Sequence, residues 1–413
     1  MPCQNKQKIV SILAGLVLLP FLCFIFLSDL DDLGNYQGDE STWITVSERL
    51  FRLYALERNF SDPDWYKEFN TFGSRQPQIG KYLIGLGAVT TDFRGDPREY
   101  LWQWSKSREW NMGHTVPPAK VVARARFPVA IMGVIACLSF YWLVTLVTNQ
   151  WCGLLALANL LGARLLLDLS RRAMIDTPAF TFGLLTLIGM VYLLRSLRDN
   201  HTGSAVYCAI LTGLAAGAAV GTKLNALLIL LVCIISIAGE ALLSIYSSRI
   251  KAYAAFLCMF IVLGVAGMVF YLSNPFLYHA PLAGFKHMLE MNDIVFDIPY
   301  QSLSTLPERI SALWKNTGVF APFANIGLPV DRVILLLGIV AFCIMSFRQG
   351  YKRLRYCGLD LILLWIVISY AGIILWLPHD WPRYYLPLQP CNAFLQAYGI
   401  CWVVSGLRNL VRS

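Results

Sequence analysis

Residues 9–28 read IVSILAGLVLLPFLCFIFLS, and a short polar stretch then leads to Gly38-Asp39-Glu40-Ser41. The apolar run carries no charge and is long enough to cross a bilayer. Beyond the acidic pair, residues 43–56 carry apolar side chains at helical spacing, which predicts an amphipathic helix in the membrane surface. Two carboxylates are therefore expected where lipid meets water. The structural alternative is that Asp39 or Ser41 only caps the following helix.

The composition of the whole chain indicates a membrane protein. Of its 413 residues, 57% are apolar and 14% are charged, and the mean hydropathy is +0.55. Soluble domains contain about 25% charged residues. The net charge of +9 does not indicate a nucleic-acid partner, because most basic residues fall in short loops between apolar runs. The eleven cysteines lie mainly in apolar runs without C-x-x-C spacing, so they are expected to form neither a disulfide framework nor a metal site.

Ten apolar runs predict ten membrane spans, and we expect an all-α polytopic fold with a single domain over residues 1–413. The predicted spans are residues 9–28, 125–147, 151–169, 178–195, 205–221, 224–242, 252–272, 331–347, 358–377 and 384–406. The first run lacks a following A-x-A-like cleavage site, which favours a retained anchor. Residues 79–89 are apolar but too short to span, which predicts a re-entrant or surface helix.

Loop charge predicts the orientation. With the N-terminus in the cytoplasm, four of five inner loops are basic, which matches the positive-inside rule. Both termini are then inside. The two long loops, residues 29–122 and 273–330, are outside, and the first of them is amphipathic and rich in tryptophan.

Charged residues in or beside the spans gather at the predicted outer ends. Transporters usually place polar groups or broken helices near the midplane, and here the midplane is almost free of charge. Arg164 and Asp168, four residues apart, are expected to face each other on one helix. This distribution favours a site that acts at the level of the lipid headgroups.

Five short segments carry the candidate site residues, and each has a structural alternative. An interfacial lysine, a helix cap or an aromatic pair at a membrane surface explains much of each segment alone. The five segments are Asp39-Glu40, residues 75–81 (RQPQIGK), 170–178 (SRRAMIDTP), 221–225 (GTKLN) and 379–387 (HDWPRYYLP). In the last segment, an arginine among Trp, Tyr and Pro has a rigid setting in which to bind an anion.

The predicted topology puts all five segments on the same face of the membrane. A carboxylate can accept the proton of an attacking hydroxyl, and lysine or arginine stabilises a departing phosphate. A lipid tail on that phosphate would explain a site at the bilayer edge. These residue types together favour a transferase that acts on a lipid phosphate.

Six segments in order resemble the type-C glycosyltransferases (GT-C) of the protein O-mannosyltransferase and lipid A aminoarabinose transferase group. They are Asp39-Glu40, residues 75–81, 124–128 (RARFP), 170–178, 221–223 and 383–387 (RYYLP). The resemblance implies a GT-C fold and a polyprenyl-phosphate sugar donor.

The resemblance also implies the roles of individual residues. Asp39 would be the general base, and Glu40 and Asp176 would orient it or the acceptor. Donor phosphate contacts are expected from Lys81, Arg172, Lys223 and Arg383, and substrate contacts from Gln76, Tyr384 and His379. The segment at 75–81 departs from the family pattern, because glutamines stand where relatives have His or Lys and a second Pro. If that position contacts the phosphate or the acceptor, the departure implies a substrate different from those of the better-known members.

We therefore expect a glycosyltransferase that moves a sugar from a polyprenyl-phosphate carrier to an acceptor hydroxyl of a lipid, glycan or protein. No cofactor is required by this scheme, although surface carboxylates could ligate a divalent metal. The chain also lacks the large soluble domain of many relatives, which favours a bacterial inner membrane, with the site on the non-cytoplasmic face. The alternatives are a transporter or flippase of a lipid-linked saccharide, and a non-catalytic scaffold.

Overall fold

The computed structural model describes residues 2–34, 36–60, 76–96, 99–245, 248–296, 302–319, 330–377 and 379–412. Within these ranges the protein is helical, and the only β-type pairing is an isolated bridge between Ser302 and His379. Six of the described helices are long and apolar enough to cross a membrane by length and composition. The protein is thus an all-α integral membrane protein, as the sequence predicts.

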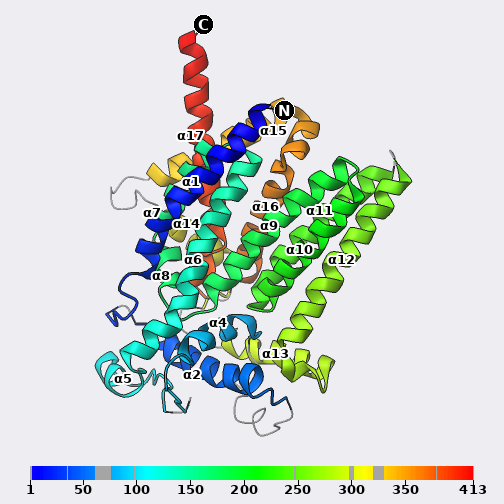
Figure 1. The fold of residues 1–413 in the computed structure, drawn as a ribbon. Helices are drawn as coiled ribbons and strands as arrows, with labels where there is room; N and C mark the ends of the chain where they lie inside the picture. The colour runs from blue at the N-terminus through cyan, green and yellow to red at the C-terminus, as the bar shows by residue number, and fades with distance from the viewer. Residues whose placement is uncertain are drawn as a thin grey trace.

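Each of the ten predicted spans corresponds to a helix or to a pair of consecutive helices (Figure 1). They are α1 (Pro2–Leu27), α6 (Ala119–Val147), α7 (Gln150–Gly162) with α8 (Leu165–Ser170), α9 (Asp176–Arg198), α10 (Thr202–Val220), α11 (Leu227–Ile245), α12 (Arg249–Ser273), α15 (Val330–Cys357), α16 (Leu359–Trp376) and α17 (Leu388–Arg412). The main apolar core includes Phe26, Phe140 and Leu187, which are fully buried. The number of helices that span the membrane stays a prediction.

Shorter helices connect these long ones. They are α2 (Gly38–Phe51), α4 (Ile79–Ala88), α5 (Arg108–His114), α13 (Pro281–Phe296) and α14 (Leu306–Val319), with the single turns η1 (Arg52–Leu56), η2 (Leu224–Ala226), η3 (Pro275–Leu277) and η5 (Pro382–Tyr385). In Figure 1, α2, α4, α5 and α13 lie at one end of the bundle, and the start of α1 and the end of α17 lie at the opposite end. We call the first of these the α2–α4 end.

The predicted span 151–169 is interrupted. Helix α7 stops at Gly162, and Arg164 has a φ of +55°, a left-handed conformation that ends a helix. Arg164 and Asp168 are both exposed, and Asp168 belongs to the separate short helix α8. The expectation that these two residues face each other on one continuous helix is therefore wrong. The break returns the chain early to the α2–α4 end, where residues 171–175 form a loop.

Helices α2 and α4 correspond to the helices predicted at 43–56 and 79–89, and their place at the membrane surface stays a prediction. Helix α4 packs closely on both sides because it has glycines there. A side chain at Gly85 would collide with the Ser47 carbonyl of α2, and one at Gly87 with the Arg124 carbonyl of α6. Only glycine permits such backbone contact. The sequence GLG at 85–87 thus fixes α4 between α2 and α6.

A buried ion pair joins α2 to the bundle. The guanidinium of Arg126 on α6 donates to both carboxylate oxygens of Glu40, at 2.8 and 2.9 Å. Glu40 is fully buried, and its oxygens also accept hydrogen bonds from the backbone N–H groups of Gln37 and Ala173. Arg126 further donates to the Leu30 carbonyl at 3.0 Å. One carboxylate thus fixes the start of α2 against α6 and against the loop before α9.

A second ion network lies at the opposite end of the bundle. Glu240 of α11 pairs with Arg198 of α9 and with Arg355 of α15. Arg198 also pairs with Asp360 of α16 at 2.8 Å. These pairs connect four helices at the end where the sequence places the basic inner loops.

Replacing Arg126 should destabilise the protein. In Arg126→Gln the carboxylate of Glu40 stays buried without its cation, which costs about 3–5 kcal/mol. We expect a clear drop in the thermal unfolding midpoint of the detergent-solubilised protein, measured by intrinsic fluorescence. The matched control is Arg171→Gln, because Arg171 pairs at 3.5 Å with the exposed Asp29. That pair contributes about 1 kcal/mol or less, and equal shifts in both variants would contradict the role of the buried pair.

Candidate active site

Four segments that are distant in sequence meet at the α2–α4 end. Asp39 is the second residue of α2, and Asp176 is the first residue of α9. Both carboxylates thus lie in a first helical turn, where the helix dipole stabilises negative charge. Lys223 follows α10 and precedes η2, and Arg383 lies in η5, which begins with Pro382. Proline is well suited to the first position of a helical turn.

The four charged groups form two ion pairs. Arg383 Nη1 donates to Asp39 Oδ2 at 2.6 Å, and Lys223 Nζ donates to Asp176 Oδ1 at 2.6 Å. The ring of Tyr384 joins the pairs, because its centroid lies 5.5 Å from Lys223 Nζ and 5.8 Å from Arg383 Cζ. The result is two ion pairs whose cations both lie near one aromatic ring. The predicted convergence of these segments is present in the structure.

Exposure distinguishes the two carboxylates. The side chain of Asp39 is 32% exposed, whereas that of Asp176 is 5% exposed. A general base must come within hydrogen-bonding distance of the hydroxyl that it activates. Asp39 can meet that requirement directly. Asp176 is placed to hold Lys223.

Arg383 keeps its charge in this setting. Burial alone would lower the pKa of its guanidinium, but Asp39 and Asp176 outweigh burial and raise that pKa above its ordinary value. The Arg383 side chain as a whole is 18% exposed. A permanent cation beside the proposed base can bind an anionic group.

The segment at 75–81 packs against the segment that carries Lys223. Lys81 is fully buried, its Nζ donates to the Gln76 carbonyl at 2.6 Å, and it lies 5.9 Å from the ring centroid of Trp43. The N–H of Ile79 donates to the Gly221 carbonyl at 2.8 Å. These contacts place Lys81 beside the Lys223 segment. Arg75, the first residue of RQPQIGK, lies outside the described residues.

Close packing at Gly80 supports the same placement. A side chain there would collide with Ile175 and Thr222, the neighbours of Asp176 and Lys223. Helix α4 therefore begins directly against the two loops that carry one ion pair of the site.

Glu40 and Arg172 lie at the edge of the site. The carboxylate of Glu40 is bonded to Arg126 and to the backbone N–H groups of Gln37 and Ala173, so it fixes the helix that carries Asp39. Arg172 Nη1 donates to Gln37 Oε1 at 2.6 Å, just before α2. The predicted roles of both residues in orientation and phosphate binding stay predictions.

Three aromatic rings form a stack beside Arg383. His379 is fully buried and stacks on Trp381, with ring centroids 4.7 Å apart and an interplanar angle of 18°. Trp381 stacks on Tyr384 at 5.5 Å. The backbone of His379 also bridges to Ser302 in the second long loop. The stack gives the segment at 379–385 the rigid setting that its sequence predicts.

Sequence reasoning missed two residues of this region. In the sequence Arg126 belongs only to the segment 124–128, although in the structure it is the partner of Glu40. Trp381 was noted only as part of a rigid aromatic segment, although its ring lies 4.8 Å from Arg383 Cζ. The sequence shows Arg126 only as a basic residue at the start of a span, and Trp381 only as an indole two residues before Arg383. Neither signal identifies a partner.

The described part of the chain contains no group of three or more His, Cys, Asp or Glu side chains arranged to hold a metal ion. The carboxylates of Asp39 and Asp176 are paired with Arg383 and Lys223.

Three-dimensional comparison finds solved structures with a similar fold. ArnT from Cupriavidus metallidurans, in the apo state and bound to undecaprenyl phosphate, matches with a TM-score of 0.55 and 14% identity. The match covers 95% and 94% of this chain and 60% of each ArnT chain. The oligosaccharyltransferase AglB from Archaeoglobus fulgidus matches with a TM-score of 0.50 and 14% identity over 96% of this chain and 51% of that chain. This chain thus spans about half to three fifths of the length of these proteins.

Sequence comparison identifies the family. No curated protein matches the chain. The family model of dolichyl-phosphate-mannose-protein mannosyltransferases matches residues 53–280, which is more than half of the chain. That stretch includes Lys81, Arg126, Asp176 and Lys223. On this evidence, the protein belongs to the dolichyl-phosphate-mannose-protein mannosyltransferase family.

Proposed function

We propose that this protein is a glycosyltransferase that moves a sugar from a polyprenyl-phosphate carrier to an acceptor hydroxyl. The observation that carries the proposal is the meeting of two ion pairs, Asp39–Arg383 and Asp176–Lys223, beside Tyr384 at one end of a membrane helix bundle. It combines an accessible carboxylate with two cations, as transfer from a lipid phosphate requires. No described feature favours a flippase instead.

The proposed reaction is a single inverting displacement. Asp39 accepts the proton of the acceptor hydroxyl while the acceptor oxygen bonds to the anomeric carbon. The bond between that carbon and the phosphate oxygen breaks, and its electron pair stays on the phosphate. Arg383 and Lys223 stabilise the negative charge that the phosphate gains. Asp176 holds Lys223 in place.

The similar proteins support the class of donor. The ArnT structure contains undecaprenyl phosphate, and the AglB structure contains dolichol-phosphate with an inhibitory peptide. The family model is named after a dolichyl-phosphate mannose donor. These facts favour a polyprenyl-phosphate carrier here as well. The acceptor is proposed only as a lipid, glycan or protein hydroxyl.

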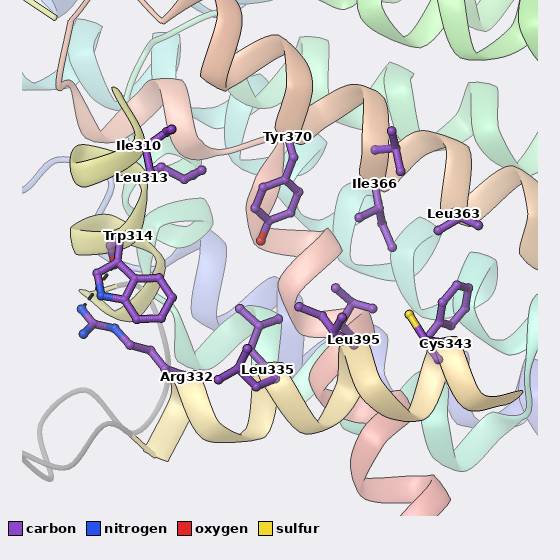
Figure 2. A pocket seen from close by; sticks show the side chains of 14 residues that line it. Ile310, Leu313, Trp314, Arg332, Leu335, Cys343, Leu363, Ile366, Tyr370 and Leu395 are labelled. Atoms are coloured by element: carbon purple, nitrogen blue, oxygen red, sulfur yellow. Dashed lines mark hydrogen bonds between the residues drawn. The ribbon is translucent and has the colours of Figure 1, made fainter. Parts of the chain in front are cut away.

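An apolar groove offers a place for the lipid tail of the donor. It has a volume of about 400 Å³ and is lined by α14, α15, α16 and α17 (Figure 2). Leu336 and Val367 on its rim are about half exposed, so the groove is accessible from the side of the bundle. Its residues Leu313 and Tyr370 belong to the apolar cluster that also contains Tyr384. The groove is therefore next to the apolar cluster that packs against Tyr384.

We place the site on the non-cytoplasmic face of the membrane, and the inner membrane of a bacterium stays the predicted location. The basic loops at the other end of the bundle support this orientation. The mechanism needs no cofactor, because Lys223 and Arg383 supply the positive charge. Carboxylates are also ligands that a divalent metal accepts, and a role for such an ion stays a prediction.

Asp39→Asn should abolish transfer and leave the fold intact. An amide cannot accept the proton, and loss of a general base costs about 10²–10⁴-fold in rate. The measurement is transfer from a panel of radiolabelled polyprenyl-phosphate sugars by the purified protein. Asp29→Asn is the matched control, because Asp29 is 76% exposed and pairs only with Arg171. Full activity of Asp39→Asn would remove this residue as the base.

Lys223→Gln should reduce kcat/KM for the donor about tenfold to a hundredfold. The change removes a charge-assisted contact to the departing phosphate, worth about 1.5–3 kcal/mol. Lys286→Gln is the matched control, since Lys286 is 79% exposed and forms only a long pair with Glu290. Equal kinetics of the two variants would exclude Lys223 from phosphate binding.

Val367→Trp should raise the KM for a long-chain donor, because an indole at the rim would fill part of the groove. A short-chain donor, which does not occupy the groove, should be affected much less. Val340→Trp on α15 is the matched control, since Val340 is similarly exposed but does not line the groove. The same KM increase for both chain lengths would argue against a tail site in the groove.

A further inference from the structure

Arg383 is held from two sides in the structure. One side is the carboxylate of Asp39, which accepts its hydrogen bond at 2.6 Å. The other is the indole of Trp381, whose centroid lies 4.8 Å from the guanidinium carbon. This distance is well within the range of a cation–π contact, and Trp is the ring that attracts cations most strongly.

Trp381 is itself held firmly. Its ring stacks on the fully buried ring of His379, and the Trp381 carbonyl accepts a hydrogen bond at 3.0 Å from the N–H of Tyr384. The indole is therefore part of a rigid element, whereas the long side chain of Arg383 has many rotamers. The indole of Trp381 can therefore define the position of the Arg383 guanidinium.

The reaction moves negative charge from one partner of Arg383 to another. Before donor binding, the two carboxylates of the site are balanced by Arg383 and Lys223. A polyprenyl-phosphate sugar brings one further negative charge. As the sugar leaves, Asp39 gains a proton and loses its charge, while the phosphate gains a second charge. The total charge is unchanged, but the group that needs Arg383 is now the phosphate.

Because Arg383 changes its anionic partner during the reaction, a third contact that does not change can hold its guanidinium in position. A guanidinium has five donors in a planar fork, so it can face a carboxylate and a phosphate together. Its hold on Asp39 weakens as that carboxylate is protonated. The attraction of the Trp381 ring depends on neither anion, so it persists throughout the reaction.

We propose that Trp381 is a positioning residue: its indole holds the Arg383 guanidinium in place while the partner of that guanidinium changes from Asp39 to the donor phosphate. The inference rests on the proposed function and deepens it. In this role Trp381 acts through its contact with Arg383.

The test compares Trp381→Leu with Trp381→Phe in the full chain. The first readout is binding of a short-chain isoprenyl phosphate without sugar, by calorimetry, and the second is kcat and KM for transfer. Trp381→Leu should weaken phosphate binding about fivefold to thirtyfold, and Trp381→Phe should restore most of the affinity because it retains a ring face. The thermal unfolding midpoint checks that each variant is folded.

Trp110 provides a matched control within the same protein. Its ring also stacks on a histidine, His114, and also carries a cation, Lys106, at 5.7 Å. It lies on α5, outside the proposed site, so Trp110→Leu should leave binding and transfer unchanged.

The outcomes separate the inference from the proposed function. Wild-type affinity in folded Trp381→Leu, or equal losses in the Leu and Phe variants, would overturn the positioning role while the wild type still transfers sugar. Wild-type protein that neither binds an isoprenyl phosphate nor transfers sugar would overturn the proposed function, and the positioning role with it.

Discussion

The buried pair between Glu40 and Arg126 is the interaction on which the site depends. An ionised carboxylate without solvent is stable only when a cation and further donors surround it, and here Arg126, Gln37 and Ala173 supply them. The pair determines where α2 begins. Asp39 is adjacent in sequence, so the position of the proposed base follows from the position of a residue that cannot itself reach the substrate.

Much of the fold could be predicted from the sequence, because a bilayer allows few solutions. Backbone groups in lipid must bond within the same segment, so long apolar runs become helices and charged residues move to their ends. The helix at 79–89 was predictable for the same reason, as an apolar run too short to span. The break at Arg164 was not, because its cause is one left-handed residue in an otherwise apolar run.

The candidate site was predictable as a set of residues but not as a set of contacts. Topology alone places Asp39, Asp176, Lys223 and Arg383 at one end of the bundle. Which carboxylate pairs with which cation depends on loop conformations that residue types do not encode. Glu40 illustrates the difficulty: beside Asp39 in sequence it has the same chemistry, yet burial gives it a different role.

The cations of the site are paired with its own carboxylates, and this pairing has a consequence for selectivity among lipids. Membranes contain abundant phospholipids whose headgroups also carry phosphate, and an unpaired lysine or arginine would attract them. In this protein Lys223 and Arg383 are already neutralised, so a passing headgroup gains little unless it disrupts two short ion pairs. Only a lipid whose tail also fits the adjoining groove is compensated for that disruption. For the proposed donor, internal neutralisation would therefore favour a carrier whose tail fits the groove over the bulk phospholipids.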